Sequence, residues 1–258
     1  MFKSIGFIGG GRITRIILGG FDRKEKWPGK VIVSDANNDV LKDLQKRFPK
    51  IEAAGGDIKK PSVADVVFLA LHPPAIMGIL GEMQSTLRRD AIVVSLAPKI
   101  SISQLSGGLD GFPRIIRMIP NAPAVVNNGY NPLAFSVAFS KEEKKKLRTW
   151  FKVLGDCPEV AEEKLEAYAI ITAMGPTYFW FQLYELEDLG NSFGMAPKEV
   201  KESVAKMLKG TINTMTNSGL TPMEVMDLIP VKPLGEEEAN IRNIYRTKLQ
   251  GLYNKLKG

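Results

Sequence analysis

The sequence predicts an α/β protein, with a doubly wound domain over residues 1–158 and an all-α domain over residues 159–258. Three observations carry this prediction. Short apolar runs alternate with amphipathic stretches up to about residue 155, a glycine turn follows the first run, and only helical patterns follow Pro158. The chain has 258 residues, 44% hydrophobic and 24% charged, so its composition is that of a globular protein and its length allows two domains.

Six apolar runs in the first part of the chain have the β-branched and aromatic residues of buried strands. They are SIGFIG at 4–9, VIVSD at 31–35, VVFLAL at 66–71, AIVVSLA at 91–97, RIIRMIP at 114–120 and PLAFSVAF at 132–139. Helical or turn-like patterns lie between them, at 12–20, 37–48, 74–87, 101–107 and 141–152. Strands that alternate with helices predict a parallel sheet covered by helices on both faces.

The second part of the chain is helical in pattern from Glu162 onward. An apolar segment, Ala167–Leu186, is followed by amphipathic stretches at 197–218, 222–228 and 236–256. The apolar segment is about as long as a membrane span, roughly 20 residues. Because it contains Gly175-Pro176, Gln182 and Glu185, we expect instead a helix buried between subunits or domains.

Composition restricts the function further. The formal charge is +7, but the densest basic run, Lys141–Arg148, is interrupted by two Glu and predicts a solvated helix face instead of a nucleic-acid site. One cysteine and one histidine cannot form a disulfide or a zinc cluster, so we expect no metal. The N-terminal residues lack the features of a signal peptide, and we expect a cytoplasmic protein that binds neither membrane nor nucleic acid.

A glycine turn carries the first functional signal. Gly9 and Gly11 follow a predicted strand directly, and Arg12 and Ile13 open a predicted helix. In this position glycines let backbone N–H groups approach a pyrophosphate at the positive end of the helix. Thr14 takes the place of the usual third glycine, which we expect to loosen the packing slightly. The turn predicts a Rossmann-type dinucleotide-binding domain, and a purely structural glycine turn is the alternative.

The nature of the dinucleotide is suggested by Asp35, at the end of the second predicted strand. An acidic side chain there can accept hydrogen bonds from the adenine ribose, which favours NAD over NADP. Four residues lie near enough to receive a 2′-phosphate, so NADP stays open; they are Arg12, Ser34, Asn37 and Asn38. A simple turn cap is a further alternative.

Three later strand ends are expected at the same crevice, because ligands bind at the carboxyl ends of parallel strands. His72 follows the third predicted strand, and we favour cofactor contact over proton transfer for it. Ser95–Pro98 would face the nicotinamide, and Asn121, held between two prolines, would touch the nicotinamide amide or the substrate. The residues expected to contact the cofactor are Gly9, Gly11, Arg12, Ile13, Asp35, Ala70, His72, Pro73, Ala97 and Asn121.

The order of these motifs resembles the pyrroline-5-carboxylate reductase family over about residues 4 to 220. IPNAPA at 119–124 is similar to that family's MPNTPA, and Gly175-Pro176-Thr177-Tyr178 is similar to its GPAY. The resemblance implies an NAD(P)H-dependent reductase in which a helical dimerisation domain follows the cofactor domain. It implies hydride transfer to the C=N carbon of a cyclic imino acid, as in proline biosynthesis, with Asn121, Gly175, Pro176 and Thr177 at the substrate.

The sequence departs from that family where the substrate carboxylate should bind. A hydroxyl-rich turn is replaced by residues 229–236, IPVKPLGE, and Ala122 replaces a threonine. Three hypotheses therefore remain: a reductase of a small cyclic imine, a dinucleotide-binding regulatory or scaffold protein without turnover, and another Rossmann oxidoreductase such as a hydroxyacid dehydrogenase or a coenzyme F420-dependent NADP reductase. No side chain is identified as catalytic. We expect a homodimer or a higher homo-oligomer formed through the helical domain.

Overall fold

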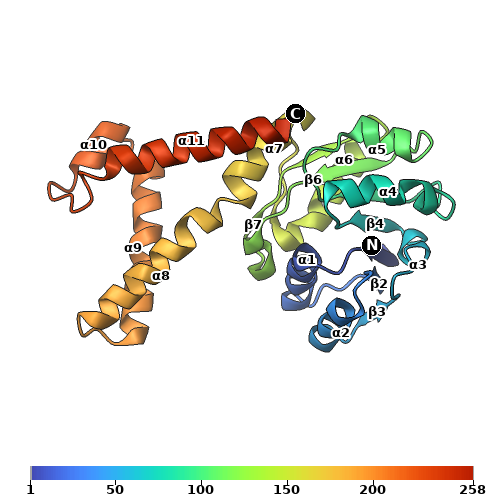
Figure 1. Ribbon diagram of the computed structural model, residues 1–258, viewed down its shortest axis with the longest axis horizontal. Coiled ribbons are helices and arrows are strands. Elements are labelled where there is room, and N and C mark those ends of the chain that lie inside the picture. Colours follow the sequence, from blue (N-terminus) through green and yellow to red (C-terminus); the bar gives the residue numbers. More distant parts are fainter. Residues whose placement is uncertain (1, 258) are drawn as a thin grey trace. The chain divides into compact units, whose positions relative to one another are not determined.

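The structure is a computed structural model that describes residues 2–257. It contains two compact units (Figure 1). The first comprises residues 2–174 together with 252–257, and the second comprises residues 175–251.

A seven-stranded sheet forms the centre of the first unit, in the order β3-β2-β1-β4-β5-β6-β8. All neighbouring strands are parallel except β8, which runs antiparallel to β6. The order reverses between β1 and β4, which is the position where open α/β sheets bind ligands. The strands are β1 Ser4–Ile8, β2 Lys30–Ser34, β3 Ile51–Ala53, β4 Val66–Leu69, β5 Ile92–Ser95, β6 Ile115–Met118 and β8 Leu133–Phe135.

Helices cover both faces of this sheet, so the predicted doubly wound fold is confirmed. Phe7, Phe68 and Val94 point to one face, where they pack against α1 (Arg12–Arg23), α2 (Asn38–Arg47) and α6 (Lys141–Phe151). Val67 and Leu69 point to the other face, toward α4 (Pro73–Gln84) and α5 (Ile102–Gly108). Strands buried on both sides explain why the sequence shows continuous apolar runs instead of alternation.

The short elements were not predicted. They include β3, the helix α3 (Lys59–Ser62), the 3₁₀ turns η1 (Ala122–Val126) and η2 (Lys152–Leu154), and a small separate sheet of β7 (Gly129–Tyr130) and β9 (Gly155–Asp156). Elements of two to five residues are too short to show a period, and their backbone pairing depends on the rest of the fold.

The first unit extends beyond the predicted strands. The 3₁₀ turn η3 (Glu162–Lys164), the helix α7 (Leu165–Tyr168) and the π-helical turn η4 (Ala169–Ala173) belong to it. Leu165 and Ala169 are buried with Ala134 of β8 and with Ile119, which follows β6. The compact units therefore divide later in the chain than residue 158. A boundary between independently folding domains after residue 158 stays a prediction.

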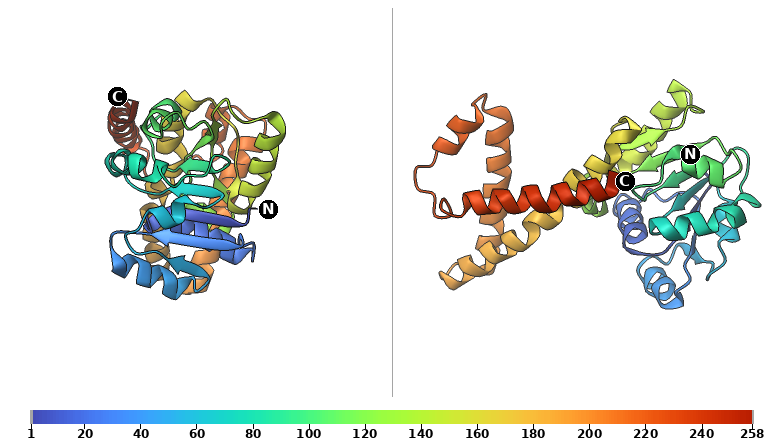
Figure 2. Two further views of the ribbon diagram at one scale, coloured as in Figure 1. Left: turned by 90° about the vertical axis from the view of Figure 1, so that its right-hand side faces the viewer. Right: turned by 45° about the horizontal axis from the view of Figure 1, so that its top comes forward.

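The second unit is helical, and Figure 2 shows its helices from two further directions. α8 (Pro176–Ser192) packs against α9 (Pro197–Asn217), which is followed by α10 (Pro222–Asp227). The last helix, α11 (Glu238–Lys257), belongs to this unit as far as residue 251. We expected the segment Ala167–Leu186 to form one helix, and this prediction was wrong. The π-helical turn η4 and Pro176 divide the segment. No helix within residues 2–257 has the length and apolarity needed to cross a membrane.

Candidate functional site

The glycine turn between β1 and α1 has two glycines with different constraints. Gly9 has φ +105°, and a Cβ atom there would lie 2.5 Å from the carbonyl oxygen of Ala70, so only glycine fits. Gly11 has φ −70°, and a Cβ atom there would meet nothing within 4 Å. The backbone is therefore drawn tightly to β4 at Gly9, while open space lies over Gly11.

Thr14 supports this turn, whereas we expected it to loosen the packing. Its side chain is fully buried, and its hydroxyl donates to the carbonyl oxygen of Gly9 at 2.5 Å. A glycine could not form this hydrogen bond. The threonine therefore fixes the Gly9 backbone by a contact of its own.

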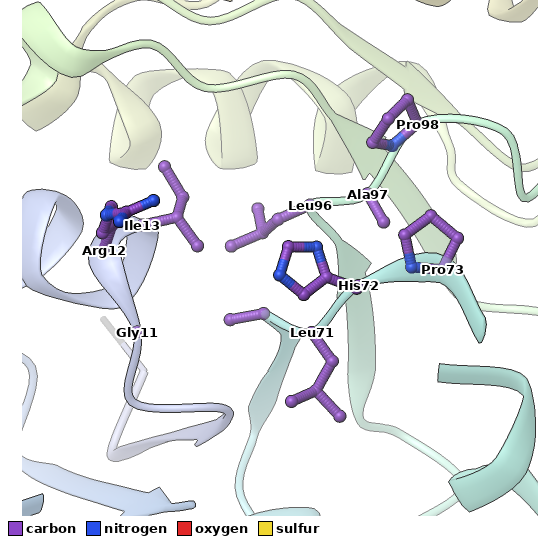
Figure 3. A pocket seen from close by; sticks show the side chains of 10 residues that line it. Gly11, Arg12, Ile13, Leu71, His72, Pro73, Leu96, Ala97 and Pro98 are labelled. Atoms are coloured by element: carbon purple, nitrogen blue, oxygen red, sulfur yellow. The ribbon is translucent and has the colours of Figure 1, made fainter. Parts of the chain in front are cut away.

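A cavity of about 430 Å³ opens beside Gly11, at the carboxyl ends of β1, β4 and β5. In Figure 3 the His72 imidazole lies between the start of α1 and the segment from Leu96 to Pro98. Seven of the residues predicted to contact the cofactor line this cavity, and Leu71, Leu96 and Pro98 complete it. The lining is Gly11, Arg12, Ile13, Ala70, Leu71, His72, Pro73, Leu96, Ala97 and Pro98.

The helix ends around this cavity suit an anion. α1 begins after Gly11 without a capping side chain and has no acidic residue in its first turn. α4 begins after His72, again without a side-chain cap or an early acidic residue. By contrast, the N–H groups that open α2, α5 and α6 are capped by Asn or Ser side chains. Backbone N–H groups thus remain available at α1, where a pyrophosphate would be stabilised by the helix dipole.

A second cavity, of about 360 Å³, continues on the other side of Arg12, between α1 and α2. It contains two arginines, Arg12 and Arg15, together with Asn37, Asp39 and Asp43. Arg15 was not predicted at the site, because it stands one position beyond the glycine motif. An extended dinucleotide needs two adjoining spaces on either side of its pyrophosphate, and these two cavities share Gly11 and Arg12.

Asp35 lies at the end of β2 and ties the glycine turn to it. Its Oδ2 accepts a hydrogen bond from the N–H of Gly10 at 2.8 Å, and its Oδ1 accepts one from the N–H of Asn37 at 2.8 Å. The turn-capping alternative is thus present in the structure. A carboxylate has about four acceptor positions, so two remain for a ribose hydroxyl, and the predicted cofactor contact stays a prediction.

His72 is exposed, and its imidazole makes no hydrogen bond to another residue of the described chain. A histidine that acts as a general base needs a partner to orient it. The structure supplies none for His72. Its position in the cavity fits the predicted cofactor contact better than proton transfer.

Asn121 lies outside the cavity lining and is buried. Its Oδ1 accepts from the N–H of Tyr130 at 3.0 Å, and its Nδ2 donates to the carbonyl oxygen of Thr172 at 3.4 Å. Thr172 stands four residues before Pro176, which has no N–H to donate to it. The side chain of Asn121 therefore joins the IPNAPA turn to the interrupted helix that leads to Gly175-Pro176, and its contact with cofactor or substrate stays a prediction.

The other residues expected at the substrate, Gly175, Pro176 and Thr177, open α8 in the second unit. Residues 229–236, which replace the hydroxyl-rich turn, form an exposed loop that ends in a turn. The assignment of these residues to a substrate also stays a prediction.

Cys157 is the only cysteine of the chain, and it is buried. Burial raises the pKa of its thiol to about 12. The side chain is consequently a neutral thiol at physiological pH and does not act as a nucleophile.

Comparisons with known proteins agree with this geometry. Residues 4–99 match the family model described as NADP oxidoreductase, coenzyme F420-dependent. Pyrroline-5-carboxylate reductase of Escherichia coli (strain K12) is 27% identical over 89% of this chain and 85% of its own. That of Corynebacterium melassecola is 24% identical over 97% of this chain and 93% of its own.

Solved structures show the same fold. The 1-pyrroline-5-carboxylate reductase of Streptococcus pyogenes superposes with a TM-score of 0.76 at 20% identity, covering 98% of both chains. The Plasmodium falciparum pyrroline carboxylate reductase with NADP bound superposes with a TM-score of 0.76 at 17% identity, covering 99% of this chain and 95% of that chain. The predicted resemblance to pyrroline-5-carboxylate reductases is thus confirmed over most of the chain, as are the predicted class, an NAD(P)-dependent oxidoreductase, and its cofactor, NAD or NADP.

Proposed function

We propose that the protein is an NAD(P)H-dependent reductase of a small cyclic imine, with 1-pyrroline-5-carboxylate, the precursor of proline, as the first candidate substrate. One observation carries the proposal: the cavity at the carboxyl ends of β1, β4 and β5 combines an uncapped helix start with an apolar wall. The similarity to pyrroline-5-carboxylate reductases over most of the chain supports the choice of substrate.

Different residues of the cavity bind different parts of the cofactor. The free N–H groups at the start of α1 and the guanidinium of Arg12 hold the pyrophosphate. Leu71, Leu96 and Pro98 form an apolar wall that excludes water from the nicotinamide. The cofactor, when bound, supplies a hydride from C4 of the nicotinamide.

The reaction needs little help from side chains. A cyclic imine is protonated at nitrogen by solvent, and its carbon then accepts the hydride, so one proton and one hydride convert C=N to CH–NH. Because the protonated imine is already electrophilic, the protein contributes orientation and exclusion of water. This agrees with a cavity whose only imidazole has no orienting partner in the described chain.

Steady-state oxidation of NADH and NADPH with a panel of cyclic imines tests the proposal. We expect turnover with at least one five-membered imino acid, and no turnover with 2-oxoacids, which a hydroxyacid dehydrogenase would reduce. Binding of cofactor without turnover on any imine of the panel would refute a reductase.

That last result would instead support a dinucleotide-binding regulatory protein. The observation that favours this second function is the loop at 229–236, which contains no Ser or Thr to hold a substrate carboxylate. A regulatory protein would bind NADH or NADPH with the same affinity in the presence and absence of the imines, whereas a reductase consumes the reduced cofactor.

A further inference from the structure

Three charged side chains meet at the carboxyl end of the sheet, outside the cavity lining. Arg117 of β6 is 3% exposed, and its two terminal nitrogens contact Glu162 at 3.0 Å and Glu166 at 2.6 Å. Glu162 lies on η3 and Glu166 on α7, so both carboxylates come from the segment that follows Pro158. The sequence motifs did not indicate this cluster, because its members lie 45 and 49 residues apart.

The same two carboxylates hold the backbone of the turn between β5 and α5. Oε1 of Glu166 accepts a hydrogen bond from the N–H of Lys99 at 3.1 Å. Oε1 of Glu162 accepts one from the N–H of Ile102, the first residue of α5, at 2.7 Å. Lys99 has φ +76°, a left-handed conformation that a lysine adopts only when its surroundings impose it.

This turn continues directly from the cavity wall. Leu96, Ala97 and Pro98 line the cavity, and the held residue Lys99 is next in the chain. From this connection, and resting on the proposed function, we infer that Arg117, Glu162 and Glu166 are positioning residues that set the distance of the Leu96–Pro98 wall from the nicotinamide.

Stability alone is a weak reason for such a cluster. A buried ion pair loses most of its Coulombic gain to desolvation, and an apolar packing of similar volume is often as stable. The cluster also contains buried polar atoms without a hydrogen-bond partner, which lowers stability. These atoms are Nε of Arg117 and Oγ of its neighbour Ser95 on β5. The ion pairs do, however, fix geometry. One guanidinium orients both carboxylates, and the oriented carboxylates can hold the strained turn in one place.

The inference is tested by comparing two ligands, NADH and ADP-ribose, which lacks the nicotinamide. Glu166→Ala frees the N–H of Lys99, so the wall becomes mobile on the nicotinamide side only. We expect the affinity for NADH to fall by up to about tenfold, the limit reached if ordering the wall again on binding costs as much as one charge-assisted hydrogen bond, while that for ADP-ribose stays within about twofold. The fluorescence of bound NADH should also shift toward that of free NADH, which reports exposure of the nicotinamide to water.

Two further variants keep the test decisive. Glu166→Gln retains an oxygen acceptor for Lys99 and should restore most of the NADH affinity. Glu162→Ala alters a more exposed position, 32% accessible, and tests the same turn if Glu166→Ala does not fold. A purely structural cluster would lower the melting temperature and weaken both ligands in parallel.

Asp65 provides a matched control at the opposite end of the sheet. Its carboxylate accepts hydrogen bonds from the N–H groups of Lys3 and Ser4 and pairs with Arg88. Like Glu166, it thus holds backbone N–H groups and an arginine, but it lies away from the cavity. Asp65→Ala should leave the ratio of the two affinities unchanged. Equal losses for NADH and ADP-ribose in the Glu166 and Glu162 variants would overturn the inference, whereas failure of the unaltered protein to bind NADH would overturn the proposed function instead.

Discussion

At the scale of single residues, Asp35 shows what the sequence can and cannot predict. Its place at the end of a strand follows from the pattern, because strand ends and glycine turns have local signals. Its hydrogen bonds to Gly10 and Asn37 do not follow from the sequence pattern, because they depend on how the ends of β1 and β2 meet in the sheet. The cavity residues next to glycines and prolines were predictable because they too have local signals. The Arg117 cluster was not predictable, because its members are far apart in sequence.

Asp35 gives a prediction about the cofactor. A negative charge at the end of β2 repels a 2′-phosphate, so the protein should bind NADH at least as tightly as NADPH. Asp35→Asn removes the charge and should raise the affinity for NADPH relative to NADH about tenfold, as measured by fluorescence titration. Asp57→Asn is the control, since Asp57 also accepts a backbone N–H but lines neither cavity. A hundredfold preference of the unaltered protein for NADPH would contradict this prediction.

At the scale of elements, long periodic segments were predictable and interruptions were not. The helices at 12–23, 38–47 and 197–217 follow from apolar spacing, and Pro197 marks the start of the third. The division of Ala167–Leu186 was not expected. A π-helical turn is rare, and here it is held by a side chain distant in sequence, since Asn121 satisfies the carbonyl oxygen of Thr172 that Pro176 leaves free.

The interrupted helix should therefore depend on Asn121. Asn121→Ala leaves the N–H of Tyr130 and the carbonyl oxygen of Thr172 without this partner, which costs about 1–3 kcal/mol. We expect the melting temperature to fall by about 3–8 °C in a thermal unfolding experiment. Asn128→Ala, at an exposed position of the same loop, should change it by less than about 1 °C. Equal melting temperatures for the two variants would show that Asn121 does not hold this turn.

At the scale of the whole molecule, the alternation of strands and helices predicted the fold class, because it reflects how a parallel sheet is connected. The prediction of the oligomeric state rests instead on exposed apolar side chains. The unit of residues 175–251 carries many large apolar side chains on its surface, among them Phe179, Trp180, Phe181 and Tyr184 on α8. Apolar surface of this extent is typical of an interface between subunits.

We accordingly propose a homodimer or higher homo-oligomer formed through the helical residues. Trp180 is 45% exposed, and Trp180→Asp should shift the protein toward monomer and lower its solubility in sedimentation experiments. Gln182→Asp adds the same charge to the same helix without removing an apolar side chain, and should leave the assembly unchanged. A stable monomer of the unaltered protein at micromolar concentration would contradict the proposal.

Binding of a nicotinamide dinucleotide over Gly11 is the central claim, and titration of NADH and NADPH into a matched pair of Gly11 variants tests it most directly. A side chain at Gly11 meets no neighbour within 4 Å, its φ of −70° is ordinary, and Asp is a favourable residue at a helix start, so Gly11→Asp should fold as well as the unaltered protein. Its carboxylate would occupy the place of the pyrophosphate and repel it. We predict a loss of affinity of about a hundredfold for Gly11→Asp and a smaller loss for Gly11→Ala, with unchanged melting temperatures. A folded Gly11→Asp variant that binds either dinucleotide as tightly as the unaltered protein would contradict the claim.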